Sequence, residues 1–313
     1  MSGPGEEAGA GRLRHRALFY RDQAEYRARV LAFLRDGLAQ GEPSFIALPG
    51  GEARQLADQL GAGPGDLRCS DMAELGRNPA RIIPELKAFV DRNPGRNVRF
   101  AGEPVWAGRS PAEICEALRH EALLNLAFQR AQLTILCPYD LARLGPSVIA
   151  GARHTHPEYV ANGQPAAVGD MAPWEIPPEC DRPLPPPPGH AETLSYRTDL
   201  APVRRLVASH ARSSGLGSDR AGDLVLAASE IAANTLGHTT SGGVLHIWHD
   251  EREVFCQAHD QGWILDPLAG RIRRSPDSRG HGLYLVNHVC DLVELRTGRS
   301  GTTVRMHMQL PPP

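Results

Sequence analysis

A proline-rich stretch divides the chain and limits what it can fold into. Residues 171–190 contain eight prolines, four of them consecutive at 185–188. Proline has no amide hydrogen and a fixed φ, so this stretch favours extended polyproline II over helix or sheet. We interpret it as a semi-rigid spacer between two domains, and a docking ligand for a partner is the alternative. The expected organisation is a disordered N-terminus at 1–13, a domain at 14–168, a linker at 169–192 and a domain at 193–313.

The length of 313 residues suits two domains of ordinary size. The residues are 41% hydrophobic and 22% charged with a net charge of −2, which gives no general attraction to nucleic acid or anionic membranes. We find no apolar run of about eighteen residues and no secretory signal, so we expect a cytoplasmic protein without a membrane association. The six cysteines are scattered without a Cys-x-x-Cys pair, and isolated core thiols are expected rather than a zinc site or disulfides.

Apolar runs alternate with helical patterns through the first half of the chain. Such alternation predicts an α/β domain with a mostly parallel sheet covered on both faces. A Pro-Gly-Gly loop follows the second run at 49–51 without the Lys-Ser/Thr pair of a phosphate loop, so we expect no nucleotide hydrolysis in this half. The expected strands lie at 16–20, 44–48, 67–69, 98–100 and 133–137, with helices at 22–40, 79–91 and 111–130.

The first half of the chain contains several short sequence motifs. They lie at 71–72, 76–84, 102–106, 120–125 and 137–140. Together they resemble the MEDS (DcmR-like) sensory domain of methanogen and methylotroph regulators, a divergent relative of the RecA-like ATPases. The resemblance covers about residues 14–168 and implies the sensing of a signal, with a small-molecule ligand that it does not identify.

Four side chains of the first half are candidates for lining a ligand pocket. A pocket at the carboxyl ends of the strands, where open α/β sheets bind ligands, could be lined by Glu103, Trp106, Glu121 and Tyr139. The alternative is that Trp106 packs in the core and both glutamates are solvated or cap helices. The sequence leaves these two interpretations open.

The second half contains a helical segment with polar residues at a spacing of four. Glu230, Asn234 and His238 would share one face of a helix, because four residues are about one helical turn. A carboxylate can accept the proton of an attacking hydroxyl, and an amide oxygen is a ligand that Mg²⁺ accepts. Alone, the trio also fits the solvated face of an ordinary helix, and His238 fits a helix end favoured by the dipole.

The elements around this helix predict an α+β fold with helices on one face of a mixed, mostly antiparallel sheet. Alternating runs at 244–248 and 254–258 form one expected hairpin, and 292–297 and 303–309 form another. Further helices are expected at 200–214, with Asp199 as N-cap, and at 282–291. Ser218 or Asp219 is expected to cap the helix that carries Glu230.

Four motifs in a fixed order point to a known family. They are Glu-x-x-x-Asn-x-x-x-His at 230–238, Asp-x-Gly at 260–262, Gly-x-Gly-Leu at 280–283 and Gly-Thr-Thr-Val at 301–304. This order resembles the GHKL (Bergerat-fold) ATPases, and among them the serine/threonine switch kinases that act as anti-sigma factors. The resemblance covers roughly 193–310 and implies ATP and Mg²⁺ as cofactors.

The resemblance implies a role for each motif residue. Asp260 would accept a hydrogen bond from the adenine amino group with Thr303 beside it, and Gly262 would let the backbone pass close to the base. The other roles are Gly280 and Gly282 at the phosphates, Asn234 as the Mg²⁺ ligand and Glu230 as the catalytic base.

One position departs from the family pattern. The second glycine often found two places after Gly262 is absent, and Trp263-Ile264 follows instead. We expect this bulky pair to affect turnover more than nucleotide binding. The loop before Gly280 is expected to close over the nucleotide, and no single role is assigned to its arginines at 271, 273, 274 and 279.

The two resemblances together predict a switch protein of bacterial stress-response transcription. It would bind an alternative sigma factor and phosphorylate an anti-anti-sigma (STAS-type) antagonist on Ser or Thr, under control of the sensory domain. A homodimer is implied by relatives of the C-terminal domain. The second hypothesis is an ATP-binding interaction module that transfers no phosphate.

Two further functions are disfavoured. A sensor histidine kinase needs a helical hairpin with an acceptor histidine where this chain has its proline stretch. Direct DNA binding lacks a basic stripe or a helix-turn-helix pattern.

Overall fold

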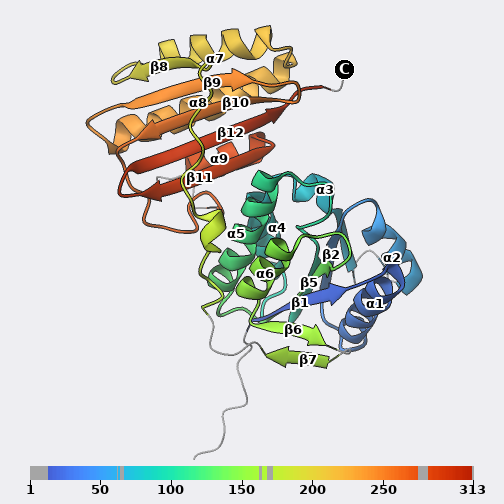
Figure 1. The fold of residues 1–313 in the computed structure, drawn as a ribbon. Helices are drawn as coiled ribbons and strands as arrows, with labels where there is room; N and C mark the ends of the chain where they lie inside the picture. The colour runs from blue at the N-terminus through green and yellow to red at the C-terminus, as the bar shows by residue number, and fades with distance from the viewer. Residues whose placement is uncertain are drawn as a thin grey trace, which may run out of the picture. The chain divides into compact units, whose positions relative to one another are not determined.

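The computed structural model describes residues 13–61, 63, 67–161, 164–167, 172–273 and 281–311. These residues divide into two compact units (Figure 1). The N-terminal unit runs to Gly76 and continues over Glu85–Cys180, and the C-terminal unit combines Arg77–Pro84 with the chain from Asp181 onward. In the described part of the chain, no helix combines the length and apolar character needed to cross a bilayer.

The N-terminal unit is built on a seven-stranded sheet in the order β3-β2-β4-β5-β1-β6-β7. Every pairing is parallel except the last, between β6 and β7, so the predicted mostly parallel sheet is confirmed. The strands are β1 Arg14–Tyr20, β2 Ser44–Leu48, β3 Leu67–Asp71, β4 Val98–Gly102, β5 Leu133–Asp140, β6 Glu158–Ala161 and β7 Gln164–Ala167.

Helices connect these strands, and two of them begin with side-chain caps. The Asp22 carboxylate accepts a hydrogen bond from the Glu25 amide at the start of α1, and Ser110 forms a reciprocal capping box with Glu113 before α5. The helix expected from Pro79 opens as a 3-10 turn. The helices are α1 Gln23–Ala39, α2 Glu52–Leu60, α3 Met72–Leu75, η1 Pro79–Arg81, α4 Ile82–Asp91, α5 Pro111–Ala127, α6 Pro146–Thr155 and η2 Pro178–Cys180.

Alternation along β1 sends its side chains to opposite faces of the sheet. Leu18 and Tyr20 pack in one core cluster with α1 and α2. His15 points to the other face, where it contacts Glu121 and Asn125 of α5. The sheet is therefore covered on both faces, as the sequence predicted.

The C-terminal unit has a five-stranded sheet in the order β11-β12-β10-β9-β8. All four pairings are antiparallel, so the sheet is more uniform than the mixed sheet that we expected, and the α+β class is confirmed. The strands are β8 Glu192–Tyr196, β9 Gly243–His249, β10 Glu253–Asp260, β11 Leu292–Gly298 and β12 Gly301–Gln309.

Three helices share one hydrophobic core with a single face of this sheet. The helices are α7 Ala201–Ser213, α8 Ser218–His238 and α9 His281–Val289. The predicted cap of α8 is wrong: Gly217 occupies the N-cap position without a side-chain hydrogen bond, and the Ser218 hydroxyl bonds to Asp219 instead. Before α7, Asp199 accepts from the Ala201 amide, although Leu200 is the N-cap residue.

The proline-rich segment covers the other face of the C-terminal sheet, and Figure 1 shows it in yellow-green as it crosses the strands. The Arg305 guanidinium donates to the Pro185 carbonyl, and Arg296 donates to the Arg182 carbonyl at 3.2 Å. Extended proline backbone keeps its carbonyl groups free for such contacts, because it forms no internal hydrogen bonds. The segment is thus bound along the sheet, and β12 is buried on both faces over most of its length.

Beside the arginines, a buried histidine lies between two carboxylates. His307 contacts Glu253 at 3.1 Å and Glu294 at 3.0 Å through its two ring nitrogens. Burial opposes the charged ring, but the two carboxylates outweigh it and raise the pKa of His307 to about 9. The charged form is therefore favoured in the folded state.

We predict that this histidine makes the stability of the C-terminal unit depend on pH. Because its folded pKa lies above its ordinary value of 6.5, its contribution is complete below pH 6.5 and is lost as pH rises to about 9. This shift in pKa corresponds to about 3 kcal/mol of unfolding free energy. Hydrogen exchange of β12 amides between these pH values should show the loss in wild type and a flatter dependence in His307→Gln. An equal slope in both proteins would contradict the prediction.

Candidate functional site

Helix α8 presents the predicted acid and amide on its partly exposed side. Leu224 and Ile231 are buried in the core, and this fixes the rotation of the helix. Glu230 and Asn234 are consequently half-buried, one turn apart, and His238 is exposed as the last residue of α8. The helical spacing of the trio therefore agrees with the sequence-based prediction.

A cavity of about 370 Å³ opens beside α8. Its volume falls in the range of small-molecule sites, and its wall is mostly apolar with a few polar groups, as such sites are. Asn234, Asp260 and Gly262 belong to the wall. The full lining is Ile231, Asn234, His238, Thr239, Asp260, Gly262, Trp263, Ile264, Leu265, Asp266, Ala269, Gly270, Leu283, Thr302 and Val304.

Asp260 is held in a fixed orientation at the end of β10. Its Oδ2 accepts a hydrogen bond from the Thr235 hydroxyl at 2.6 Å, and its Oδ1 accepts from the Gly262 amide at 2.7 Å. The Tyr196 hydroxyl in turn donates to Thr235 at 3.1 Å. Each carboxylate oxygen keeps a second lone pair, so Asp260 can still accept a hydrogen bond from a ligand amino group in the cavity.

The threonine beside Asp260 is Thr302, not Thr303. In the antiparallel register of β10 and β12, Asp260 pairs with Thr302 and His259 pairs with Thr303. Thr302 lines the cavity and donates to the Gly262 carbonyl at 2.9 Å, whereas the Thr303 hydroxyl contacts His259 at 3.0 Å. A shift of one residue along a strand reverses the face, and the sequence did not fix that register.

Gly301 explains how β12 can approach this point. Its φ is +104°, a conformation that side chains other than glycine rarely adopt, and a Cβ there would overlap the Asp260 carbonyl. Sequence reasoning missed Thr235 and Thr302 as site residues. The only signal for them was their position directly after Asn234 and Gly301.

The first turn of α9 lies against the acid and the amide of α8. A Cβ added at Gly282 would come within 2.9 Å of Glu230 Oε2 and 3.1 Å of Asn234 Nδ2. The structure thus brings Gly282, Glu230 and Asn234 together, which the separate motifs only implied. Gly280 lies outside the described residues, as do Arg274 and Arg279.

The loop that carries the departing pair Trp263-Ile264 forms part of the cavity wall. Trp263 and Leu265 line the cavity and are 63% and 85% exposed. Between them, the Ile264 amide donates to the Thr297 hydroxyl at 3.1 Å, which ties this loop to β11. The loop therefore adds an apolar rim to the cavity.

In the N-terminal unit, two of the four pocket candidates share one environment and the other two have different neighbours, and all four are at least half-buried. Glu103 is buried and accepts hydrogen bonds from Tyr26 at 3.0 Å and from Tyr20 at 3.2 Å. Trp106 packs under the Arg109 guanidinium at 3.9 Å. The candidates Glu121 and Tyr139 both lie near His156. The alternative interpretation, in which both glutamates are solvated or cap helices, is therefore wrong.

Burial also changes the acidity of Glu103. Removal from water raises the pKa of its carboxyl to about 7, and the two tyrosine hydroxyls only partly offset this by stabilising the charged form. A group of this pKa changes its charge near neutral pH.

Comparison with known protein families gives two matches. Residues 14–157 match the model of MEDS, the methanogen/methylotroph DcmR sensory domain. Residues 195–308 match the model of the histidine kinase-like ATPase domain. Comparison with curated proteins gives no match. The chain therefore carries a MEDS domain followed by a histidine kinase-like ATPase domain, and both resemblances drawn from the sequence are confirmed at the level of these two domains.

An ATPase domain implies ATP binding, and the residues of the cavity fit that ligand. Asp260 offers a fixed hydrogen-bond acceptor inside an apolar wall, as an adenine amino group requires. Asn234 and Gly282 provide an amide and a side-chain-free backbone next to one another.

We predict that Gly282→Ala weakens nucleotide binding. The added methyl group would displace Glu230 or Asn234, and we expect a loss of roughly tenfold or more, about 1.4 kcal/mol. Isothermal titration calorimetry with ATP and Mg²⁺ measures it. Gly222→Ala is the matched control, because a Cβ at Gly222 of α8 meets nothing within 4 Å. Equal affinities of the two variants would contradict the assignment.

We predict that burial of Glu103 makes the stability of the N-terminal unit depend on pH. Its folded pKa of about 7 lies above the ordinary 4.5, so its contribution to stability is complete below pH 4.5 and is lost as pH rises to about 7. Wild type should lose about 3 kcal/mol of unfolding free energy over this pH range, and Glu103→Gln should not show this loss. Hydrogen exchange of β4 amides at both pH values measures it, with the exposed Glu74→Gln as control. A Glu103→Gln variant with the wild-type slope would rule this out.

Proposed function

We propose that this chain, in which a MEDS domain precedes a histidine kinase-like ATPase domain, is an anti-sigma regulatory factor with serine/threonine switch-kinase activity. The coarser statement, a regulatory protein with a kinase-like ATPase domain, follows from the two domains themselves. The finer proposal concerns which group receives the phosphate and which proteins bind.

The observation that carries the proposal is the juxtaposition of Glu230, Asn234 and Gly282. The carboxylate and the amide lie one turn apart on α8, and the first turn of α9 lies against both of them. A carboxylate next to a metal-binding amide is what phosphoryl transfer to a hydroxyl group requires, since one orients the hydroxyl and the other holds the metal.

In this proposal, one group of residues contacts the adenine and another acts at the phosphates. Asp260 would accept the hydrogen bond of the adenine amino group, and Thr235 and Thr302 would hold its surroundings in place. Asn234 Oδ1 would bind Mg²⁺. Bound ATP supplies the phosphoryl group, and its Mg²⁺ neutralises charge on that group. Glu230 would accept the proton of the Ser or Thr hydroxyl that receives it.

The proposed partners are an alternative sigma factor and an anti-anti-sigma antagonist of the STAS type, which would carry the acceptor hydroxyl. The MEDS domain supports a sensory input, for which we propose a small-molecule ligand. A homodimer through the ATPase domain belongs to the same proposal, from the resemblance to the switch kinases.

A second candidate is supported by the rim of the cavity. Trp263 and Leu265 expose apolar surface at its mouth, where large exposed hydrophobic side chains often mark a protein-binding surface. In this alternative, ATP stabilises a binding surface and no phosphate is transferred.

We predict that the chain labels its antagonist with phosphate from γ-labelled ATP and that Glu230→Gln abolishes most of the labelling. Loss of the base should lower the rate by roughly 10²–10⁴-fold while nucleotide binding persists. Asn234→Ala should lower both labelling and Mg²⁺-dependent binding. Glu251→Gln, in the exposed turn between β9 and β10, is the control and should label as wild type.

The outcomes separate the two candidates. Tight ATP binding without labelling of any STAS-type protein would favour the binding module. Labelling by Asn234→Ala at the wild-type rate would overturn the site assignment itself. Absence of heat on titration with adenine nucleotides would overturn both.

A further inference from the structure

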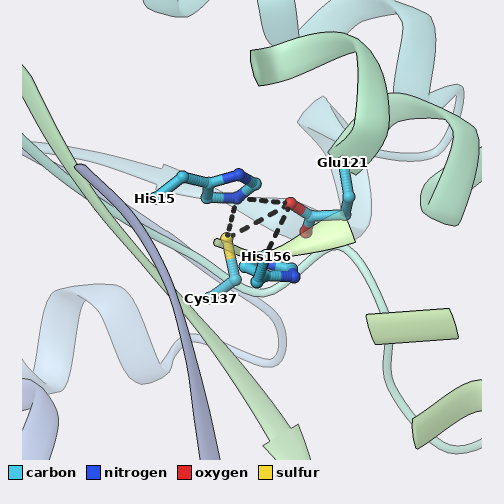
Figure 2. Close-up of side chains that lie close together, drawn as sticks. All are labelled: His15, Glu121, Cys137 and His156. Atoms are coloured by element: carbon cyan, nitrogen blue, oxygen red, sulfur yellow. Dashed lines mark hydrogen bonds and ion pairs between the residues drawn. The ribbon is translucent and has the colours of Figure 1, made fainter. Parts of the chain in front are cut away.

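Four side chains with metal-binding atoms converge inside the N-terminal unit, far from the nucleotide cavity in sequence. His15 lies on β1, Glu121 on α5, Cys137 on β5, and His156 directly follows α6. Figure 2 shows all four side chains pointing at one another. Their ligand atoms all lie within 4.8 Å of one another. None of the four contributes to the proposed kinase reaction.

The distances within the cluster are short. Glu121 Oε2 lies 2.9 Å from His15 Nε2 and 3.4 Å from both Cys137 Sγ and His156 Nε2. Cys137 Sγ is also 3.4 Å from His15 Nε2. With metal bonds of about 2.0–2.3 Å, neighbouring ligands of a tetrahedral ion lie roughly 3.3–3.6 Å apart. Three of these four distances already match, and the fourth needs to open by a few tenths of an ångström.

The cluster is fully shielded from water. His15, Glu121 and His156 are 0% exposed and Cys137 is 1% exposed. A buried carboxylate needs a compensating positive charge, and in the described part of the chain Glu121 forms ion pairs with the two histidines only. Its Oε1 atom has no hydrogen-bond partner among the described residues.

The hydrogen bonds around His15 determine which ring nitrogen carries the proton. The other nitrogen then offers its lone pair to the cluster. The Asn125 amide nitrogen donates to three backbone carbonyls, of Glu121, Thr155 and Pro173. Asn125 Oδ1 therefore faces His15 Nδ1 at 3.0 Å and needs a proton there. In the neutral ring, Nε2 then offers its lone pair to the cluster.

His156 is fixed in the same way by backbone. Its Nδ1 lies 2.7 Å from the Ala152 carbonyl and must carry the proton of that hydrogen bond. Its Nε2 has no hydrogen-bond partner among the described residues and faces Glu121 Oε2 at 3.4 Å. With a neutral ring, the Nε2 lone pair and the carboxylate oxygen repel one another, and either a proton on Nε2 or a metal ion between the two atoms removes the repulsion. Outer-shell acceptors on the far nitrogen are what metal-binding histidines usually have.

We propose that His15, Glu121, Cys137 and His156 form a tetrahedral site for a divalent transition metal ion, with zinc the best match. Two imidazoles, a thiolate and a carboxylate are a donor set of intermediate softness, which suits zinc better than magnesium or calcium. Loading releases the thiol proton to solvent and leaves a thiolate ligand.

The site has the character of a structural or regulatory centre. Four protein ligands complete a tetrahedral shell and leave no position for substrate, in contrast to catalytic zinc. The ion would join β1, β5, α5 and the residue after α6, so its binding energy would contribute to folding of this unit. This inference does not depend on the proposed kinase function.

The proposal departs from the expectation that the cysteines are isolated core thiols. Cys137 has no second cysteine near it in sequence, and its partners come from positions 15, 121 and 156. Spacing rules detect ligands that share one loop, and they miss a site that is assembled by the order of strands in a sheet.

Metal analysis of the full-length chain tests the proposal. Wild type expressed with added zinc and passed over a chelating resin should retain about one zinc ion per chain by plasma mass spectrometry. Cys137→Ser should lose it, and Cys69→Ser, an exposed cysteine, should keep it. Asn125→Ala should weaken zinc affinity roughly 10–100-fold, because His15 loses its outer-shell acceptor.

Wild type refolded with Co²⁺ keeps the test decisive if Cys137→Ser fails to fold. A thiolate-to-cobalt charge-transfer band with intense tetrahedral visible absorption is expected. Equal metal contents in wild type and Cys137→Ser, or a cobalt spectrum without the thiolate band, would overturn the proposal. A metal-free wild type, with His15 protonated and paired to Glu121, would overturn it as well.

Discussion

The hydrogen bond from Thr235 to Asp260 connects the two elements on which the nucleotide site is built. Thr235 belongs to α8, which carries Glu230 and Asn234, and Asp260 ends β10. The bond is 2.6 Å long and its donor is buried, and a charge-assisted hydrogen bond away from water is stronger than one on the surface. This bond sets the position of the Asp260 carboxylate relative to Glu230 and Asn234. A ligand that contacts all three residues therefore meets a surface that is already in place.

The sequence predicted most of this architecture because its signals are local. Helical spacing placed Glu230 and Asn234 on one side of α8, and alternation of apolar residues predicted both hairpins of the C-terminal unit. What it could not predict depends on register and on contacts between distant segments. Thr303 was expected beside Asp260, but the pairing of β10 with β12 puts Thr302 there. Gly217 replaced Ser218 as the N-cap for a similar reason, since both residues suit the helix start and only the path of the preceding chain decides.

The glycines of the motifs turn out to have a steric role before any ligand binds. Gly282 allows α9 to approach the side chains of α8, and Gly301 allows β12 to pass the Asp260 carbonyl with a positive φ. Motif reasoning assigned Gly282 to the phosphates alone. The structure adds that any larger residue there would displace the acid and amide themselves. Close packing and ligand contact therefore impose the same residue at this position, and the sequence cannot separate the two requirements.

The conformation of the proline-rich segment helps to decide whether this chain or another protein carries the group that accepts the phosphate. Residues 172–192 are all described, and their only helix is the 3-10 turn at Pro178–Cys180. Two arginines of the C-terminal sheet bind the carbonyls of this segment, so it is committed to the sheet surface and cannot form the helical hairpin of a sensor histidine kinase. The one histidine of this segment, His190, lies in a turn just before β8 and not on a helix. In the proposed function the acceptor hydroxyl comes from another protein, and the exposed apolar side chains of Trp263 and Leu265 in the cavity wall offer that protein a surface to contact.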